Sequence, residues 1–203
     1  MRKIILAGAF VELIELCEKC GYEIIGIADT ACEDKYYGYD ILGDDDYIIA
    51  NKESYRDCNI VMVPDKTSVR KKLYEKYKLA GFSFETIISP GANISKYAEI
   101  NEGAIIHDFC NVSANAVVGK CARLNVGSNV MHDSIIGDFS IVAPNSVILG
   151  RCKIGECSYI GSNSTILPER KIGANSVIGA ASVVTKDVDS QMTVAGNPAH
   201  LLK

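Results

Sequence analysis

The stretch "VMHDSIIGDFSIVAPNSVI", residues 130–148, repeats one chemical pattern every six residues. An aliphatic residue opens each hexad, and a serine follows four residues later. The aliphatic register runs without a break through Ile94, Ile100, Ile106, Val112, Val118, Leu124, Val130, Ile136, Val142, Ile148, Ile154, Ile160, Ile166, Ile172, Ile178 and Val184. A six-residue period of this kind is typical of a parallel β-helix, in which three hexads build one coil of about 18 residues.

A small residue occupies a second fixed slot, four residues after the aliphatic. It recurs at Ala98, Ala104, Cys110, Ala116, Ala122, Ser128, Ser134, Ser140, Ser146, Cys152, Ser158, Ser164, Ser176 and Ser182, and only Arg170 interrupts it. Glycine is frequent directly after the aliphatic, at Gly119, Gly137, Gly155, Gly161, Gly173 and Gly179. We expect the aliphatic side chains to point inward and these glycines to serve tight corners. An ordinary all-β domain with chance spacing would break the register somewhere.

The first 88 residues precede the six-residue repeat, and their alternating strand and helix patterns predict a small Rossmann-like domain. Segments 3–9, 22–29 and 59–65 are typical of buried strands, and segments 10–20 and 67–81 of helices. Thr67 or Ser68 is the expected cap of the second helix, and Gly81 its stop. Alternating strands and helices build a parallel sheet that binds ligands at the carboxyl ends of its strands. We therefore expect a binding domain at 1–88 and a β-helix with a C-terminal tail at 89–203.

Composition limits the location and the partners of the protein. The 203 residues carry a formal net charge of −4, so nucleic acid and anionic membrane surfaces are not expected partners. The apolar run at the N-terminus is too short for a signal peptide or a spanning helix, which predicts a cytoplasmic protein. Eight cysteines are present, and Cys110 and Cys152 occupy small slots of the repeat, which favours reduced thiols that act as small hydrophobes.

His132 occupies neither of the two buried slots of the repeat. The residue 18 positions later, in the same slot of the adjacent coil, is Gly150, whose backbone is expected within about 4.8 Å. An imidazole base beside a backbone N–H is an arrangement suited to acyl transfer, because one group takes a proton and the other stabilises an oxyanion. Asp133 is a candidate partner for the other ring nitrogen, where it would set the tautomer, although neighbouring side chains on a strand point to opposite sides. The competing interpretation is an exposed histidine without a role.

The whole chain resembles the NeuD/PglD-like sugar acetyltransferases, which join a Rossmann-like domain to a left-handed β-helix. The resemblance rests on "KIILAGA" (3–9), "GYDILGDDD" (38–46), "VRKKLYEK" (69–76), "LNVGSNVMHDSIIGDFS" (124–140) and "VAGNPAHLL" (194–202). It implies acetyl-CoA as co-substrate, no metal, and a homotrimer with each site between two β-helices.

The resemblance also implies roles for individual residues. His132 matches the general base, Asp133 its acidic neighbour, Asn125 an asparagine that holds the acceptor, and Gly150 the glycine whose amide faces the thioester carbonyl. The positions that match coenzyme A contacts are Gly150, Gly161, Ala180, Gly196 and Pro198. In the N-terminal domain, Gly8 and Asp29 match positions that bind the sugar nucleotide.

One segment departs from the family pattern. The family has a glycine-rich loop after its first strand, whereas this chain has "AGAFVELIE" (7–15), with Phe10, Val11 and Glu12 in place of small residues and a histidine. Pro64 and Asp65 likewise replace a glycine and an asparagine. An acidic side chain at a helix start disfavours a pyrophosphate, so the departure weakens the expectation of a nucleotide-linked acceptor.

The function predicted from the sequence is N-acetylation of a nucleotide-linked amino sugar of the UDP-4-amino-4,6-dideoxy type, for surface glycan synthesis. The alternatives are O-acetylation of a sialic-acid-like nonulosonic acid, transfer of a longer acyl group, and a non-catalytic sugar-binding protein. A zinc-dependent hexapeptide carbonic anhydrase is disfavoured, because His107 and His132 are 25 residues apart and do not stack in one column.

Overall fold

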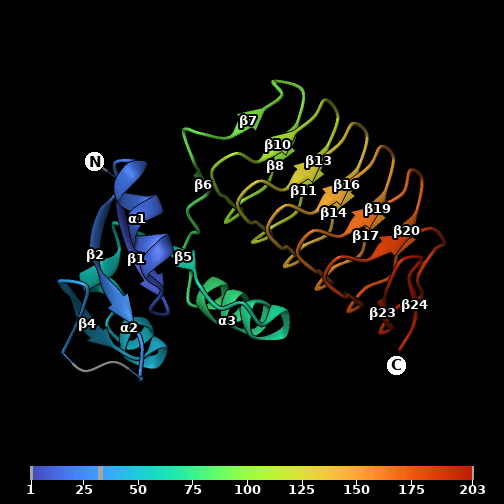
Figure 1. Ribbon diagram of the computed structural model, residues 1–203. Helices are drawn as coiled ribbons and strands as arrows, with labels where there is room; N and C mark the ends of the chain where they lie inside the picture. The colour runs from blue at the N-terminus through green and yellow to red at the C-terminus, as the bar shows by residue number, and fades with distance from the viewer. Residues whose placement is uncertain (1, 32–33, 203) are drawn as a thin grey trace. The chain divides into compact units, whose positions relative to one another are not determined.

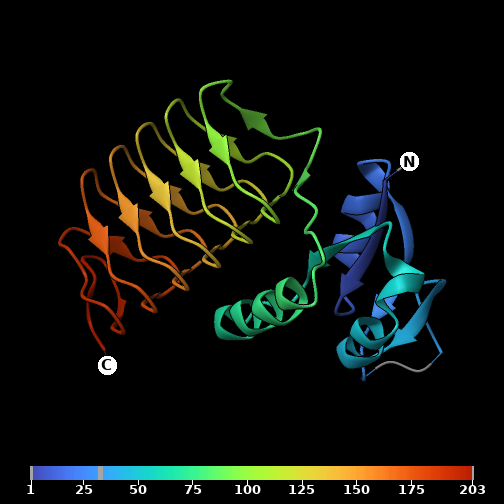
Figure 2. The ribbon, with the colours of Figure 1, turned by 180° about the vertical axis from the view of Figure 1, so that it is seen from behind.

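A computed structural model describes residues 2–31 and 34–202 of the chain. The contacts within it divide the chain into two compact units, Met1–Ile87 and Ile88–Lys203. The first is a small α/β unit and the second a parallel β-helix (Figure 1; Figure 2 gives the view from behind). The fold class predicted from the sequence is therefore confirmed. None of the helices in residues 2–31 and 34–202 is long and apolar enough to cross a bilayer.

The N-terminal unit is a five-stranded sheet in the order β3-β4-β2-β1-β5. Its strands are β1 (Lys3–Ala7), β2 (Glu23–Ala28), β3 (Lys35–Tyr36), β4 (Tyr39–Gly43) and β5 (Cys58–Met62). Its helices are α1 (Val11–Lys19), α2 (Asp45–Ala50), the 3-10 helix η1 (Lys52–Tyr55) and α3 (Thr67–Leu79). Strand β1 pairs in parallel with both β2 and β5, so the chain turns from one side of β1 to the other. Ligands bind at such a switch point in open α/β sheets.

The ends of α3 agree only in part with the prediction. The helix is capped by Lys66, without a side-chain hydrogen bond, so the expected caps Thr67 and Ser68 are wrong and both residues lie inside the first turn. Lysine has no side-chain acceptor for the free N–H groups of that turn. Gly81 ends the helix as expected, with a φ of +82° beyond the C-cap Ala80.

Three parallel sheets, named here walls 1, 2 and 3, form the β-helix. Wall 1 contains β7 (Asn93–Ile94), β10 (Asn111–Val112), β13 (Asn129–Val130), β16 (Val147–Ile148), β19 (Thr165–Ile166) and β22 (Val183–Val184). Wall 2 contains β8 (Glu99–Ile100), β11 (Val117–Val118), β14 (Ile135–Ile136), β17 (Lys153–Ile154) and β20 (Lys171–Ile172). Wall 3 contains β6 (Ile87–Ile88), β9 (Ile105–Ile106), β12 (Arg123–Leu124), β15 (Ile141–Val142), β18 (Tyr159–Ile160), β21 (Val177–Ile178), β23 (Thr193–Ala195) and the antiparallel β24 (His200–Leu201).

The repeat slots have the predicted places in the core. Val130 pairs with Ile148 of the adjacent coil, and both side chains are fully buried. Nearly all other aliphatic residues of the register are buried as well. The small slot is buried too, and its hydroxyls bond the next coil: Ser134 Oγ donates to Leu149 O at 2.8 Å, and Ser140 Oγ to Gly155 O at 2.8 Å. Serine suits this slot because it is small and carries the donor that the neighbouring carbonyl requires.

The glycines after the aliphatic serve a purpose different from the one expected. Positive φ angles fall two residues later, at non-glycine residues such as Asp133 (59°) and Asn145 (58°), and not at Gly137 or Gly155. A Cβ on Gly155 would lie 2.5 Å from Ala174 N in the next coil. These glycines therefore permit close approach of adjacent coils. The positive-φ corner position is held in most coils by residues that have side chains, and by glycine only at Gly103 (71°) and Gly127 (70°).

Candidate active site

His132 lies at the corner where the chain passes from wall 1 to wall 2. This corner, residues 131–134, follows β13 and is a turn rather than a strand. Because Asp133 adopts a φ of 59°, its carboxylate turns back toward its neighbour, and Oδ2 lies 2.8 Å from His132 Nδ1. The alternation of side chains along a strand therefore does not separate these two residues. About half of the His132 side chain, 49%, is exposed to solvent.

Gly150 occupies the same slot one coil later and lies against the other side of the imidazole. A Cβ on Gly150 would be 2.6 Å from His132 Nε2, so only glycine leaves this nitrogen open. The Gly150 carbonyl accepts a hydrogen bond from Glu169 N at 3.0 Å. Its N–H donates to no acceptor in the described part of the chain, so it is free for a ligand. The structure thus brings Gly150 to His132, as the 18-residue spacing predicted, and Asp133 to the other ring nitrogen.

Two residues that the sequence analysis did not single out complete this corner. Ala114 precedes His132 by one coil in the same slot, so the imidazole has a small neighbour on both sides along its column. Asn115 precedes Asp133 by one coil, and its Nδ2 donates to Asp133 Oδ1 at 3.0 Å. The hydrogen bond to His132, and next the one to Asn115, hold the pKa of Asp133 below its ordinary value. The 18-residue stacking that led to Gly150 also points to both residues when it is applied in the opposite direction.

Asn125 lies at another corner, where the chain passes from wall 3 to wall 1. It follows β12, its N–H donates to Val142 O at 2.9 Å, and its carbonyl accepts from Ser128 N at 3.1 Å. His107 occupies the same slot one coil earlier, since Leu124 pairs with Ile106. One chain therefore does not bring Asn125 to His132. The two residues lie at opposite edges of wall 1.

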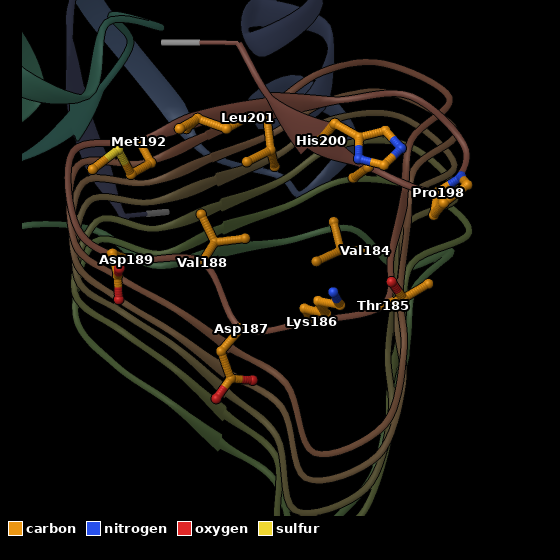
Figure 3. Close-up of a pocket in the computed structure, with 12 residues that line it drawn as sticks. Val184, Thr185, Lys186, Asp187, Val188, Asp189, Met192, Pro198, His200 and Leu201 are labelled. Atoms are coloured by element: carbon orange, nitrogen blue, oxygen red, sulfur yellow. The ribbon is translucent and has the colours of Figure 1, made fainter.

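The predicted coenzyme A contacts other than Gly150 share the corner of Asn125. Gly161 follows β18, and a Cβ there would lie 2.6 Å from Ala180 N. Gly196 follows β23, where its N–H donates to Ser182 Oγ at 3.1 Å. Pro198, after a cis peptide bond, lies at the same corner of the coil outline in Figure 3. These small residues form a column along the edge between walls 3 and 1.

A cavity of about 400 Å³ opens beside Pro198 at the C-terminal end of the β-helix. Val184 and Val188 point into it, and His200 and Leu201 of β24 border it (Figure 3). The cavity lies within the last coil, whereas His132 and Gly150 belong to earlier coils. It is therefore separate from the corner that carries the imidazole.

Gly8 and Asp29 line a pocket of about 180 Å³ at the carboxyl ends of β1, β2, β4 and β5. Both Asp29 oxygens are occupied, by Ala9 N at 2.9 Å and Ala31 N at 2.6 Å, so the carboxylate orders the loops around the pocket. Asp44 and Asp45 also line it, and burial raises the pKa of Asp45. None of the described lining residues is a lysine or arginine. The pocket lies where the sequence predicted it, but its lining is acidic.

The cysteines and histidines of the described chain offer no metal centre. No group of three or more His, Cys, Asp or Glu side chains within residues 2–31 and 34–202 is arranged to hold an ion. Cys17 is buried, and burial raises the pKa of its thiol to about 12, which keeps it protonated near neutral pH. The seven cysteines in the described residues are all free thiols.

Comparisons with known proteins agree with this architecture. A family model described as bacterial transferase hexapeptide (six repeats) matches residues 151–186. The chain is similar to the solved acetyltransferase domain of PglB from Neisseria gonorrhoeae, at 26% identity and a TM-score of 0.92 over 100% of both chains. It is similar to PerB from Caulobacter crescentus in complex with CoA and GDP-perosamine, at 26% identity and a TM-score of 0.93 over 100% of this chain and 98% of PerB.

A third solved structure, WeeI from Acinetobacter baumannii, is 26% identical with a TM-score of 0.89, and the match covers 98% of this chain and 100% of WeeI. A comparison with curated proteins gives no match. The resemblance to hexapeptide sugar acetyltransferases that the sequence indicated is confirmed along the whole chain.

Proposed function

We propose that this chain, which has the fold and repeats of the hexapeptide sugar acetyltransferases, transfers the acetyl group of acetyl-CoA to the amino group of a nucleotide-linked sugar. The observation that carries the proposal is the corner at which the His132 imidazole lies between the Asp133 carboxylate and Gly150. The PglB domain is also solved in complex with acetyl coenzyme A, and a GDP-perosamine N-acetyltransferase with CoA and GDP-perosamine. These complexes support acetyl-CoA as the donor and an amino sugar as the acceptor.

The geometry of the corner assigns a step to each residue. The acceptor nitrogen attacks the acetyl carbonyl carbon, and His132 Nε2 takes the proton that the nitrogen loses. The Gly150 N–H donates to the carbonyl oxygen as negative charge develops on it. The C–S bond then breaks, and the proton held on His132 passes to the departing thiolate, which leaves as CoA. Asp133 keeps the proton of the resting imidazole on Nδ1 and stabilises the imidazolium that forms.

We propose that the active assembly is a cyclic homotrimer. The base and Gly150 lie at one edge of wall 1, whereas Asn125, Gly161, Ala180 and Gly196 lie at the opposite edge. A cyclic head-to-tail assembly places one edge of each chain against the other edge of the next, which unites the two half-sites. The exposed imidazole would then be enclosed by the neighbouring chain.

Light scattering tests the assembly directly. The mass in solution should be three times the 21.9 kDa chain mass, and it should not change on addition of acetyl-CoA. Mixing His132→Ala and Asn125→Ala subunits should restore part of the activity, since some sites then draw an intact residue from each chain. A stable, fully active monomer would contradict the proposal.

We propose that the N-terminal unit selects the acceptor. Asp29→Ala removes the acceptor of two backbone hydrogen bonds that shape the pocket. It should raise the KM for the acceptor by about 10-fold or more, since each bond to a charged group contributes about 1.5–3 kcal/mol. The affinity for acetyl-CoA should stay unchanged. The matched control is Asp40→Ala, which removes an exposed carboxylate of the same unit that pairs with Lys35 at 2.7 Å. An equal loss of acetyl-CoA binding would indicate misfolding instead.

A second candidate acceptor is an amino sugar without a nucleotide. It is favoured by the three carboxylates at the pocket and by Glu12 in the first turn of α1, which disfavour a pyrophosphate. Acetyl-CoA consumption should be measured with UDP-amino sugars, GDP-linked amino sugars, free amino sugars, and free or CMP-linked nonulosonic acids. Turnover of an amino sugar supports N-acetylation, and turnover of nonulosonic acids alone would assign O-acetylation.

The reaction proposed here has a cytoplasmic location and serves surface glycan synthesis. Acetyl-CoA and nucleotide sugars are cytoplasmic metabolites, and a modified sugar is a building block for such glycans. A chain that consumes no acetyl-CoA with any of these acceptors, yet binds one of the sugars, would be a non-catalytic sugar-binding protein.

A further inference from the structure

Asn115 is joined to the imidazole of His132 through one carboxylate. Its Nδ2 donates to Asp133 Oδ1 at 3.0 Å, while Asp133 Oδ2 lies 2.8 Å from His132 Nδ1. We propose that Asn115 is a positioning residue, which fixes the Asp133 carboxylate and through it the tautomer and orientation of His132. The inference rests on the proposed role of His132 as the base in acetyl transfer.

The exposure of Asp133 explains why a second donor matters. The side chain is 44% exposed, so water competes for both of its oxygens and little packing restrains its rotation. With Oδ1 held by Asn115, the remaining oxygen faces the ring nitrogen. Among the described residues, Asn115 is the only side chain apart from His132 that donates a hydrogen bond to Asp133.

Arg151 lies on the other side of Asp133, one coil later in the same slot, but it is engaged elsewhere. Its Nη1 donates to Glu169 Oε1 at 3.2 Å, one further coil along. Its positive charge helps to lower the pKa of Asp133, after the hydrogen bonds from His132 and Asn115. Arg151 therefore acts on Asp133 through its charge, whereas Asn115 fixes the orientation of the carboxylate through a hydrogen bond.

The position of the Asp133 carboxylate decides which ring nitrogen of the neutral His132 imidazole carries the proton. A carboxylate held at Nδ1 keeps the proton there and leaves the lone pair on Nε2, the nitrogen beside Gly150. An imidazole free in water favours the opposite tautomer, in which Nε2 is protonated and unable to act as a base. Loss of Asn115 should therefore lower the fraction of active tautomer without removing any group that touches substrate.

Asparagine at position 115 could also be favoured by its backbone conformation alone, and a matched variant separates this explanation from the hydrogen bond to Asp133. Asn115 has a φ of 60°, a conformation that asparagine tolerates better than most residues. Asn175 occupies the equivalent position of another hexad, at the corner between walls 2 and 3, with a φ of 59°. Glycine tolerates this conformation without strain. Asn115→Gly and Asn175→Gly thus make the same backbone change, and only the first removes a donor to Asp133.

The experiment measures steady-state kinetics and the imidazole tautomer by 15N NMR in the free protein. Asn115→Gly should lower kcat by about 5- to 30-fold, less than the loss of a buried hydrogen bond to a charged group, because the Asp133 carboxylate is partly screened by water. Both KM values should stay within about 2-fold. The 15N shifts of His132 should move toward the Nε2–H tautomer. Asn175→Gly should change neither quantity.

A double-mutant cycle with Asp133→Gly completes the test. If Asn115 acts through Asp133, Asn115→Gly should cause no further loss once the carboxylate is absent. An undiminished loss in that background, or an unchanged His132 tautomer in Asn115→Gly, would overturn the proposal. The tautomer needs no substrate, so a failure to find an acetylated acceptor would affect the proposed function and leave this test intact.

Discussion

Replacing His132 with alanine should lower kcat by about 10²- to 10⁴-fold with the preferred acceptor, the range expected for a positioned acid or base. The imidazole is half exposed and lies outside the two buried slots of the repeat, so its loss removes little packing. The trimer, the unfolding temperature and the Kd for acetyl-CoA should therefore stay close to those of the unmodified protein. Kinetics, light scattering and calorimetry on the same preparation measure these quantities.

The control for this substitution is His107→Ala, at the other His-Asp pair of the β-helix. The arrangement there is different, because Asp108 Oδ1 accepts a hydrogen bond from Ser89 Oγ and the slot one coil later holds Asn125 instead of a glycine. His107→Ala should lower kcat by less than about 10-fold. The hydrogen bonds from His132 and Asn115 hold the pKa of Asp133 below its ordinary value, so this carboxylate should stay ionised to a lower pH than an ordinary aspartate. Near-normal turnover of His132→Ala would refute the assignment.

The β-helix could be predicted from the sequence because its hydrophobic pattern is local and repeats every six residues. Each aliphatic faces the core every sixth residue, so the register predicts both the buried face and the stacking partner 18 residues away, as in the pair Val130 and Ile148. The same arithmetic predicted that Gly150 lies beside His132. Applied toward the N-terminus, it would also have pointed to Asn115.

Other features depend on conformation or on assembly, which spacing does not encode. The contact between His132 and Asp133 requires the positive φ of Asp133, and a strand would have separated the two side chains. Asn125 and His132 lie at different corners because the coil has three walls. A family motif matched along the sequence does not show at which corner each of its residues lies. The carboxylates at the N-terminal pocket come from segments far apart in the chain, Asp29 after β2 and Asp44 and Asp45 after β4.

Gly150→Ala should lower kcat by about 10²-fold, comparable to the loss of one oxyanion donor, although it adds only a methyl group. The new Cβ would lie 2.6 Å from His132 Nε2 and 2.7 Å from Cε1. Since atoms do not pack this closely, the ring must rotate away, which breaks its alignment with Asp133 and blocks the approach to the free N–H of residue 150. Gly150 does not have a positive φ, so alanine fits the backbone itself.

The matched control for this substitution is Gly155→Ala, which separates an effect on chemistry from one on folding. At Gly155 the new Cβ would meet backbone, Ala174 N at 2.5 Å, and no side chain is available to move aside. Gly155→Ala should therefore destabilise the β-helix by about 1–3 kcal/mol, the usual cost of overpacking. Gly150→Ala should keep the native unfolding temperature because a half-exposed ring yields to it. If instead Gly150→Ala lowers the unfolding temperature as much as Gly155→Ala, or keeps full turnover, Gly150 is a packing residue and the oxyanion donor must be sought elsewhere.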